Sequence, residues 1–197
     1  MQDFCDSKDR LLDLLFEREF HSLIGFPCDC GRDKRVVCCH DCLGHNATCT
    51  ECFISQHATS PTHWARVWVE EGGYFVRRDI SLLRPQGYAI PLGHGGQPCP
   101  KQQKPVLFHL ISHNGVHNTQ VAFCGCRADS DCVEQLIRFG LFPATLKRPT
   151  TAFTLTVLRE FHLHHLESKE SAFDFIGALR RLTDNVFASE TSVSGSG

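Results

Sequence analysis

Apolar residues recur at helical spacing at both ends of the chain. Within residues 7–20 they form one stripe behind Ser7, which is placed to serve as an N-cap. Residues 151–168 and 171–185 show the same period and are separated by only a short polar turn. In residues 151–168 the expected apolar face comprises Leu155, Leu158 and Phe161. The pattern therefore predicts an N-terminal amphipathic helix and a C-terminal helical hairpin.

The middle of the chain carries shorter runs rich in β-branched and aromatic residues. Residues 64–80 contain two such runs separated by a Gly-Gly pair, and another lies at residues 88–92. Residues 106–123 read as a hairpin around Asn114-Gly115, a pair that favours a two-residue turn. In that register opposed residues have numbers that sum to 229, so Cys124 would face Pro105. Helices combined with short antiparallel strands predict an α+β protein.

Residues 28–63 hold seven of the twelve cysteines and four of the twelve histidines. Closely spaced donors on a tight loop can reach one ion, because a zinc–sulfur bond is about 2.3 Å and tetrahedral zinc takes four donors. Two such loops complete one site, so four pairs predict two zinc sites. Sequential and interleaved pairings both satisfy this spacing. The four pairs, in chain order, are Cys28 with Cys30, Cys39 with Cys42, Cys49 with Cys52, and His57 with His63.

Three further donors, Cys38, His40 and His45, lie beside the chosen eight. Side chains alternate along an extended segment, so Cys38 and Cys39 should face opposite ways. Cys39 keeps the two-residue spacing to Cys42 and is therefore preferred. A disulfide framework is the alternative, but the first residues are charged and lack an apolar signal core, which favours a reducing compartment and metal binding.

A third zinc site is predicted on His94, Cys99, Cys124 and Cys126, because the expected hairpin returns Cys124 to the loop that carries Cys99. His117 is the rival fourth ligand. It lies seven residues along the strand from Cys124, about 23 Å in an extended conformation, and is excluded on that distance.

Charge and missing motifs limit the function. The formal net charge is −2, and zinc bound by three or four thiolates would make the chain more negative, so nucleic acid could bind only at a local basic patch. No apolar run approaches a membrane span, and no small-molecule substrate is expected. No hydrolase, phosphate-loop or zinc-protease motif occurs, so we expect no catalytic centre. The candidate DNA contacts are Arg32, Lys34, Arg35, Arg77 and Arg78.

A succession of motifs from about Leu11 to Asn185 resembles the CxC cysteine-cluster domain attached to fungal KDZ (Kyakuja–Dileera–Zisupton) transposases. It comprises the paired cysteines and histidines above, then Leu92-Gly93-His94-Gly95-Gly96, Pro98-Cys99-Pro100, Asn114-Gly115-Val116-His117, Phe123-Cys124-Gly125-Cys126, Phe142-Pro143-Ala144-Thr145, Arg148-Pro149 with Thr151-Ala152-Phe153-Thr154, and Leu182-Thr183-Asp184-Asn185.

This resemblance implies a zinc-binding, non-catalytic region N-terminal to a ribonuclease-H-like transposase domain in the nucleus. It would recognise transposon-end DNA, chromatin or the transposase itself. The alternative is a B-box-like module for protein interaction or oligomerisation.

The order of the first eight ligands also resembles a B-box or RING-type cross-brace, which implies interleaved sites. One would comprise Cys28, Cys30, Cys49 and Cys52, and the other Cys39, Cys42, His57 and His63. The expected organisation is a helix and two-zinc module at 1–92, a third zinc site with a hairpin at 93–127, a helical extension at 128–187 and a disordered tail at 188–197.

Overall fold

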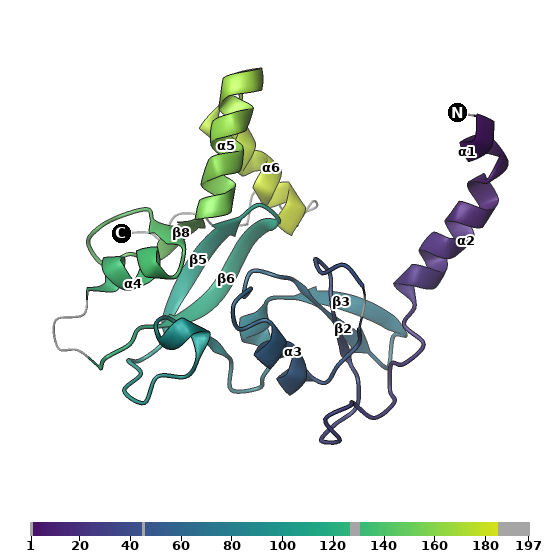
Figure 1. Cartoon of the computed structure of the whole chain (residues 1–197), viewed down its shortest axis with the longest axis horizontal. Coiled ribbons are helices and arrows are strands. Elements are labelled where there is room, and N and C mark those ends of the chain that lie inside the picture. The colour runs from purple at the N-terminus through teal and green to yellow at the C-terminus, as the bar shows by residue number, and fades with distance from the viewer. Residues whose placement is uncertain (1, 45, 127–130, 185–197) are drawn as a thin grey trace.

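The chain folds into helices and two β-sheets, as a computed structural model shows for residues 2–44, 46–126 and 131–184 (Figure 1). His45 and the predicted tail lie outside the described residues. The α+β expectation is confirmed. The helices are α1 (Gln2–Asp6), α2 (Lys8–Glu19), α3 (Thr50–Gln56), α4 (Cys132–Arg138), α5 (Leu155–Ser168) and α6 (Ala172–Thr183), with 3-10 turns η1 (Ile80–Leu82) and η2 (His94–Gly96). The strands are β1 (Val37–Cys39), β2 (Ala65–Val69), β3 (Tyr74–Arg78), β4 (Ala89–Pro91), β5 (Val106–Ser112), β6 (Gly115–Ala122), β7 (Leu141–Pro143) and β8 (Thr151–Thr154).

The first sheet carries the predicted cysteine-rich region. Its antiparallel strands have the order β1-β2-β3, and the Gly-Gly pair at residues 72 and 73 joins β2 to β3 as expected. Helix α3 packs beside β1. This arrangement places the loop before β1 beside the start of α3, and the end of β1 beside the C-terminal end of α3.

The second sheet is larger than the sequence predicts, with the order β4-β6-β5-β8-β7. The pairs β4 with β6 and β5 with β8 are parallel, whereas the hairpin β5–β6 and the pair β7–β8 are antiparallel. The assignment of 151–154 to a helix was wrong, because this segment pairs with β5 and β7. Its last residue, Thr154, then accepts a hydrogen bond from the Val157 amide and caps α5.

The hairpin forms in a register two residues away from the expected one. Ser112 pairs with Gly115, so His113 and Asn114 form the loop and opposed numbers sum to 227 instead of 229. Gly115 has φ +133, a conformation that favours glycine at this strand end. A shift of two residues leaves each side chain on the same face of the sheet as the expected register would, and Cys124 bridges Gln102 instead of facing Pro105.

One buried cluster contains side chains from both sheets and from α3 and α4, including Val37, Phe53, Phe108 and Leu136. The cluster contains residues from each of the expected segments 1–92, 93–127 and 128–187. The division of the chain into these segments remains a prediction. By contrast, α2 buries no side chain, and its apolar stripe is exposed. Figure 1 shows α1 and α2 projecting away from the rest of the chain.

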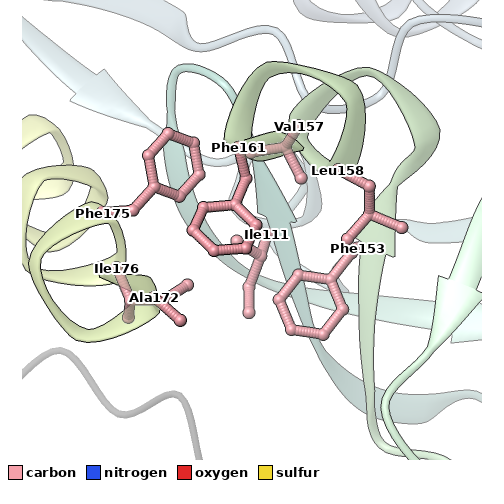
Figure 2. A pocket seen from close by; sticks show the side chains of 8 residues that line it. All are labelled: Ile111, Phe153, Val157, Leu158, Phe161, Ala172, Phe175 and Ile176. Carbon is pink, nitrogen blue, oxygen red and sulfur yellow. The ribbon is translucent and has the colours of Figure 1, made fainter. Parts of the chain in front are cut away.

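The predicted helical hairpin is present as α5 and α6, which pack on the turn end of β5 and β6. The expected face of α5 was partly wrong, because Leu155 is about half exposed and Val157 is buried. Phe161 of α5 and Phe175 of α6 flank an apolar cavity of about 200 Å³ whose floor includes Ile111 of β5 (Figure 2). Among the helices described, none combines the length and apolarity that crossing a membrane requires.

Candidate metal centres

The first cluster comprises Cys28 and Cys30 from the loop before β1, with Cys49 and Cys52 at the start of α3. The four sulfur atoms lie within 4.8 Å of one another, and Cys30 Sγ is 3.6 Å from Cys49 Sγ. A tetrahedron with 2.3 Å zinc–sulfur bonds has edges of about 3.8 Å. Gly31, at φ +69, follows Cys30 directly, and its amide donates a hydrogen bond to the Cys28 carbonyl oxygen, which closes the tight turn that carries both cysteines.

The second cluster joins the end of β1 to the C-terminal end of α3. Its donors are Cys39, Cys42, His57 and His63, again within 4.8 Å of one another. The Cys42 sulfur lies 3.5 Å from Nε2 of His57 and 3.4 Å from Nδ1 of His63. His57 Nδ1 lies 2.9 Å from the Phe53 carbonyl oxygen, a contact that fixes the ring with Nε2 toward the cluster.

The third cluster joins the η2 turn to the chain after β6. His94 Nε2 lies 3.4 Å from Cys124 Sγ and 3.5 Å from Cys126 Sγ, and Cys99 Sγ lies 3.4 Å from Cys124 Sγ. All four donor atoms lie within 4.8 Å of one another. His94 and Cys126 are exposed, so this cluster is more open to solvent than the other two, each of which consists of buried and half-buried residues.

Hydrogen bonds within the clusters lower the pKa of some thiols and raise the pKa of others. Amide hydrogen bonds, chiefly that from Cys30, lower the pKa of Cys28 to about 6. Contacts with neighbouring thiols, first that of Cys30, raise the pKa of Cys52 to about 12. In the third cluster, contact with Cys99 raises the pKa of Cys126 to about 11. Closely packed thiols therefore resist full ionisation unless a cation balances their charge.

The structure brings together each predicted ligand set, in the interleaved arrangement and not the sequential one. The disulfide alternative does not fit, since all twelve cysteines are free thiols. Of the spare donors, Cys38 and His40 belong to none of the three clusters. Cys38 is buried on the opposite side of β1, and burial raises the pKa of its thiol. The three clusters could each hold a metal ion.

The candidate DNA contacts divide into two groups. Arg35 donates hydrogen bonds to the Pro27 and Ala47 carbonyl oxygens and pairs with Asp29, which ties the loop before β1 together. Arg77 is likewise engaged within the protein, because its guanidinium lies 4.6 Å from the Trp64 ring centroid and donates to carbonyl oxygens at the end of α6. Arg77 is itself exposed, as are the remaining candidates, Arg32, Lys34 and Arg78.

The hairpin loop docks beside the second cluster, a contact that the sequence did not predict. Asn114 donates a hydrogen bond to the Thr62 carbonyl oxygen and accepts one from the Trp64 indole, on either side of His63, a member of the second cluster. His117 is buried, stacks on Trp64 with ring centroids 4.0 Å apart and contacts the Asp79 carboxylate. The sequence excluded His117 as a ligand but gave no sign of these two partners, which lie about 40 and 50 residues away along the chain.

Comparison with known proteins supports the resemblance over the second half of the chain. A family model described as "CxC2 like cysteine cluster associated with KDZ transposases" matches residues 83–187. The match includes the third cluster and the helical hairpin, whereas the first two clusters precede it. Neither the curated proteins nor the solved structures contain a match. Because the family model covers more than half of the sequence, the chain belongs to the CxC2-like cysteine clusters associated with KDZ transposases.

Proposed function

We propose that this chain is a zinc-scaffolded, non-catalytic accessory region of a KDZ-type transposase that binds transposon-end DNA. The observation that supports it most strongly is the assembly of three separate sets of four cysteine and histidine donors. Family membership supplies the link to a transposase.

Zinc suits these clusters better than calcium or magnesium. Thiolate and imidazole donors in fours, at distances close to tetrahedral edges, are typical of structural zinc sites. Calcium and magnesium prefer oxygen ligands. Four protein donors also leave no open position for a reactive water, so the sites would stabilise the fold and would not catalyse hydrolysis.

DNA contact would rest on the exposed cations near the first cluster and on β3. Arg32 and Lys34 lie on the loop between Cys30 and β1, and Arg78 ends β3. Three phosphate contacts would give a plot of log affinity against log salt a slope of about −2.7. Arg35 and Arg77 are assigned a structural role instead, because their guanidinium groups are held by carbonyl oxygens of the chain.

Fluorescence anisotropy with a transposon-end duplex and a scrambled duplex, each at two salt concentrations, tests this proposal. A variant combining Arg32→Ala, Lys34→Ala and Arg78→Ala should lose most of the binding and most of the salt dependence. The control alters equally exposed cations elsewhere, Lys104→Ala, Arg159→Ala and Arg181→Ala. Failure of the unaltered protein to bind either duplex would remove the DNA role, and equal losses in both variants would remove the assignment of the three residues.

A protein-interaction or oligomerisation module is the second candidate. Two features favour it: the apolar cavity between α5 and α6 has room for an apolar side chain, and the leucines of α2 are exposed. The partner would be the transposase catalytic domain or another protein. This candidate would be favoured if the chain bound the catalytic domain and bound neither duplex. In either case we expect a nuclear location, where the transposase reaches its DNA.

A further inference from the structure

The third cluster depends on a short knuckle, Cys124-Gly125-Cys126, whose backbone groups have separate partners. The bridge between Gln102 and Cys124 is flanked by two hydrogen bonds, from the Gln103 amide to the Phe123 carbonyl and from the Gly125 amide to the Lys101 carbonyl. Neighbouring residues on an extended strand direct their backbone groups to opposite sides. The N–H and C=O of Cys124 therefore face away from that segment and need another partner.

Gln135 of α4 supplies both partners. Its Oε1 accepts a hydrogen bond from the Cys124 amide at 2.7 Å, and its Nε2 donates one to the Cys124 carbonyl oxygen at 3.1 Å. The side chain thus pairs with the peptide groups of Cys124 as a neighbouring strand would. Gln135 is buried, with 8% of its surface exposed, on the first turns of a helix whose next residue, Leu136, is fully buried in the main core.

We propose that Gln135 is a positioning residue for the third metal centre. It holds the ligand Cys124 against α4 and thereby slows release of the metal from this site. The inference rests on the proposed function, because it requires a metal ion in the third cluster. Gln135 bonds to the backbone N–H and C=O of Cys124, so it acts through that backbone and not as a ligand.

The arrangement accounts for how an exposed cluster could retain its metal. His94 and Cys126 are open to solvent, so a competing chelator can approach from that side. Release requires the knuckle to separate from the loop that carries Cys99, and the two bonds from Gln135 oppose that motion. Groups that orient metal ligands typically change metal affinity by about 10–100-fold when they are lost.

The test compares Gln135→Leu and Gln135→Glu with a control, Glu134→Gln, on the zinc-loaded full chain. Leucine is similar in size and forms neither bond, whereas glutamate keeps the acceptor for the Cys124 amide and loses the donor. Glu134 is the adjacent residue, and its contact with Arg138 is exposed. The measurements are zinc stoichiometry by native mass spectrometry and the alkylation rate of each cysteine, resolved by peptide mapping in the presence of a chelator.

We expect three zinc ions in the unaltered chain and alkylation of Cys99 and Cys126 about tenfold or more faster in Gln135→Leu. In Gln135→Glu the alkylation rates of Cys99 and Cys126 should lie between those of the unaltered chain and those of Gln135→Leu. Cys28 and Cys42 should react at unaltered rates in both variants and in the control. Unchanged rates at Cys99 and Cys126 with three zinc ions bound would overturn the role of Gln135 alone. Two zinc ions in the unaltered chain would overturn the third site and this inference with it.

If Gln135→Leu speeds alkylation of the cysteines in all three clusters, this variant has destabilised the whole fold. The alkylation rates of Gln135→Glu then test the positioning role. Faster alkylation of Cys99 and Cys126 alone in Gln135→Glu supports the positioning role. Its absence overturns that role.

Discussion

Replacing one of two adjacent cysteines in β1 should separate metal binding from simple packing. Cys38 and Cys39 are both buried, with 2% and 6% of their surfaces exposed. They point to opposite sides of the strand, and only Cys39 belongs to the second cluster. Cys39→Ser therefore removes a predicted metal ligand, whereas Cys38→Ser makes the same chemical change one residue earlier without altering any of the three clusters.

The two changes should differ widely in magnitude. Structural zinc contributes about 10–16 kcal/mol of apparent folding free energy in small zinc modules. A whole domain is typically stable by only about 5–15 kcal/mol, so loss of the second site should unfold at least the region around β1 and α3. Cys38→Ser places a hydroxyl in a buried position, which costs about 1–3 kcal/mol. In a protein of this size that corresponds to a melting temperature lower by about 2–12 °C.

The assay is zinc content by elemental analysis combined with thermal unfolding followed by circular dichroism. Cys38→Ser should retain the zinc content of the unaltered chain and unfold in one transition at a modestly lower temperature. Cys39→Ser should lose at least one zinc ion together with native structure in the N-terminal half. Equal zinc content and equal melting temperatures in the two variants would refute the assignment of Cys39 as a ligand.

Three further predictions concern the hairpin, the thiols and the end of α6. Gly115→Ala should lower the free energy of unfolding by at least about 1–3 kcal/mol in a denaturant titration, because the added Cβ would lie 2.6 Å from Thr183 Oγ1 at a φ of +133. The control is Gly177→Ala in α6, which has open space around its Cβ and should be neutral or stabilising. In the metal-free cluster Cys28 has a pKa of about 6 against its ordinary 9.0, so its ionisation contributes stability that is complete above about pH 9 and is lost as the pH falls through about 6. Protons also compete with zinc for thiolates, so zinc release to a chelator should rise as the pH falls from 7 to 5, and a flat profile over that range would contradict the thiolate ligands. Arg77→Met should speed hydrogen exchange in the last turn of α6, since it removes two donors from the terminal carbonyl oxygens; unchanged exchange there would contradict that contact.

The three clusters of donor residues could be predicted because the spacing of cysteines and histidines is a local signal. Two donors with one or two residues between them can lie on one tight loop. Alternation of side chains along β1, together with the spacing to Cys42, was enough to choose Cys39 over Cys38. The helical periods of α2, α5 and α6 were similarly visible, since each repeats within a single segment.

Long-range pairing was not visible in the same way. The parallel contact between β5 and β8 joins residues about 40 apart and depends on the complete sheet, so 151–154 was mistaken for helix. The hairpin register missed by two residues because both His113-Asn114 and Asn114-Gly115 can form a two-residue loop, and the contacts of Gly115 with α6 lie far along the chain. Gln135 showed no signal beyond its place in a helix, because its partner is a backbone and not a side chain.

The central claim is that three closed zinc sites shape this chain, and zinc stoichiometry tests it most directly. Native mass spectrometry and elemental analysis on chain purified without added chelator should both give three zinc ions per molecule, and denaturation should release all three. Two zinc ions would contradict the third cluster. A folded chain that contained no zinc would contradict the account as a whole.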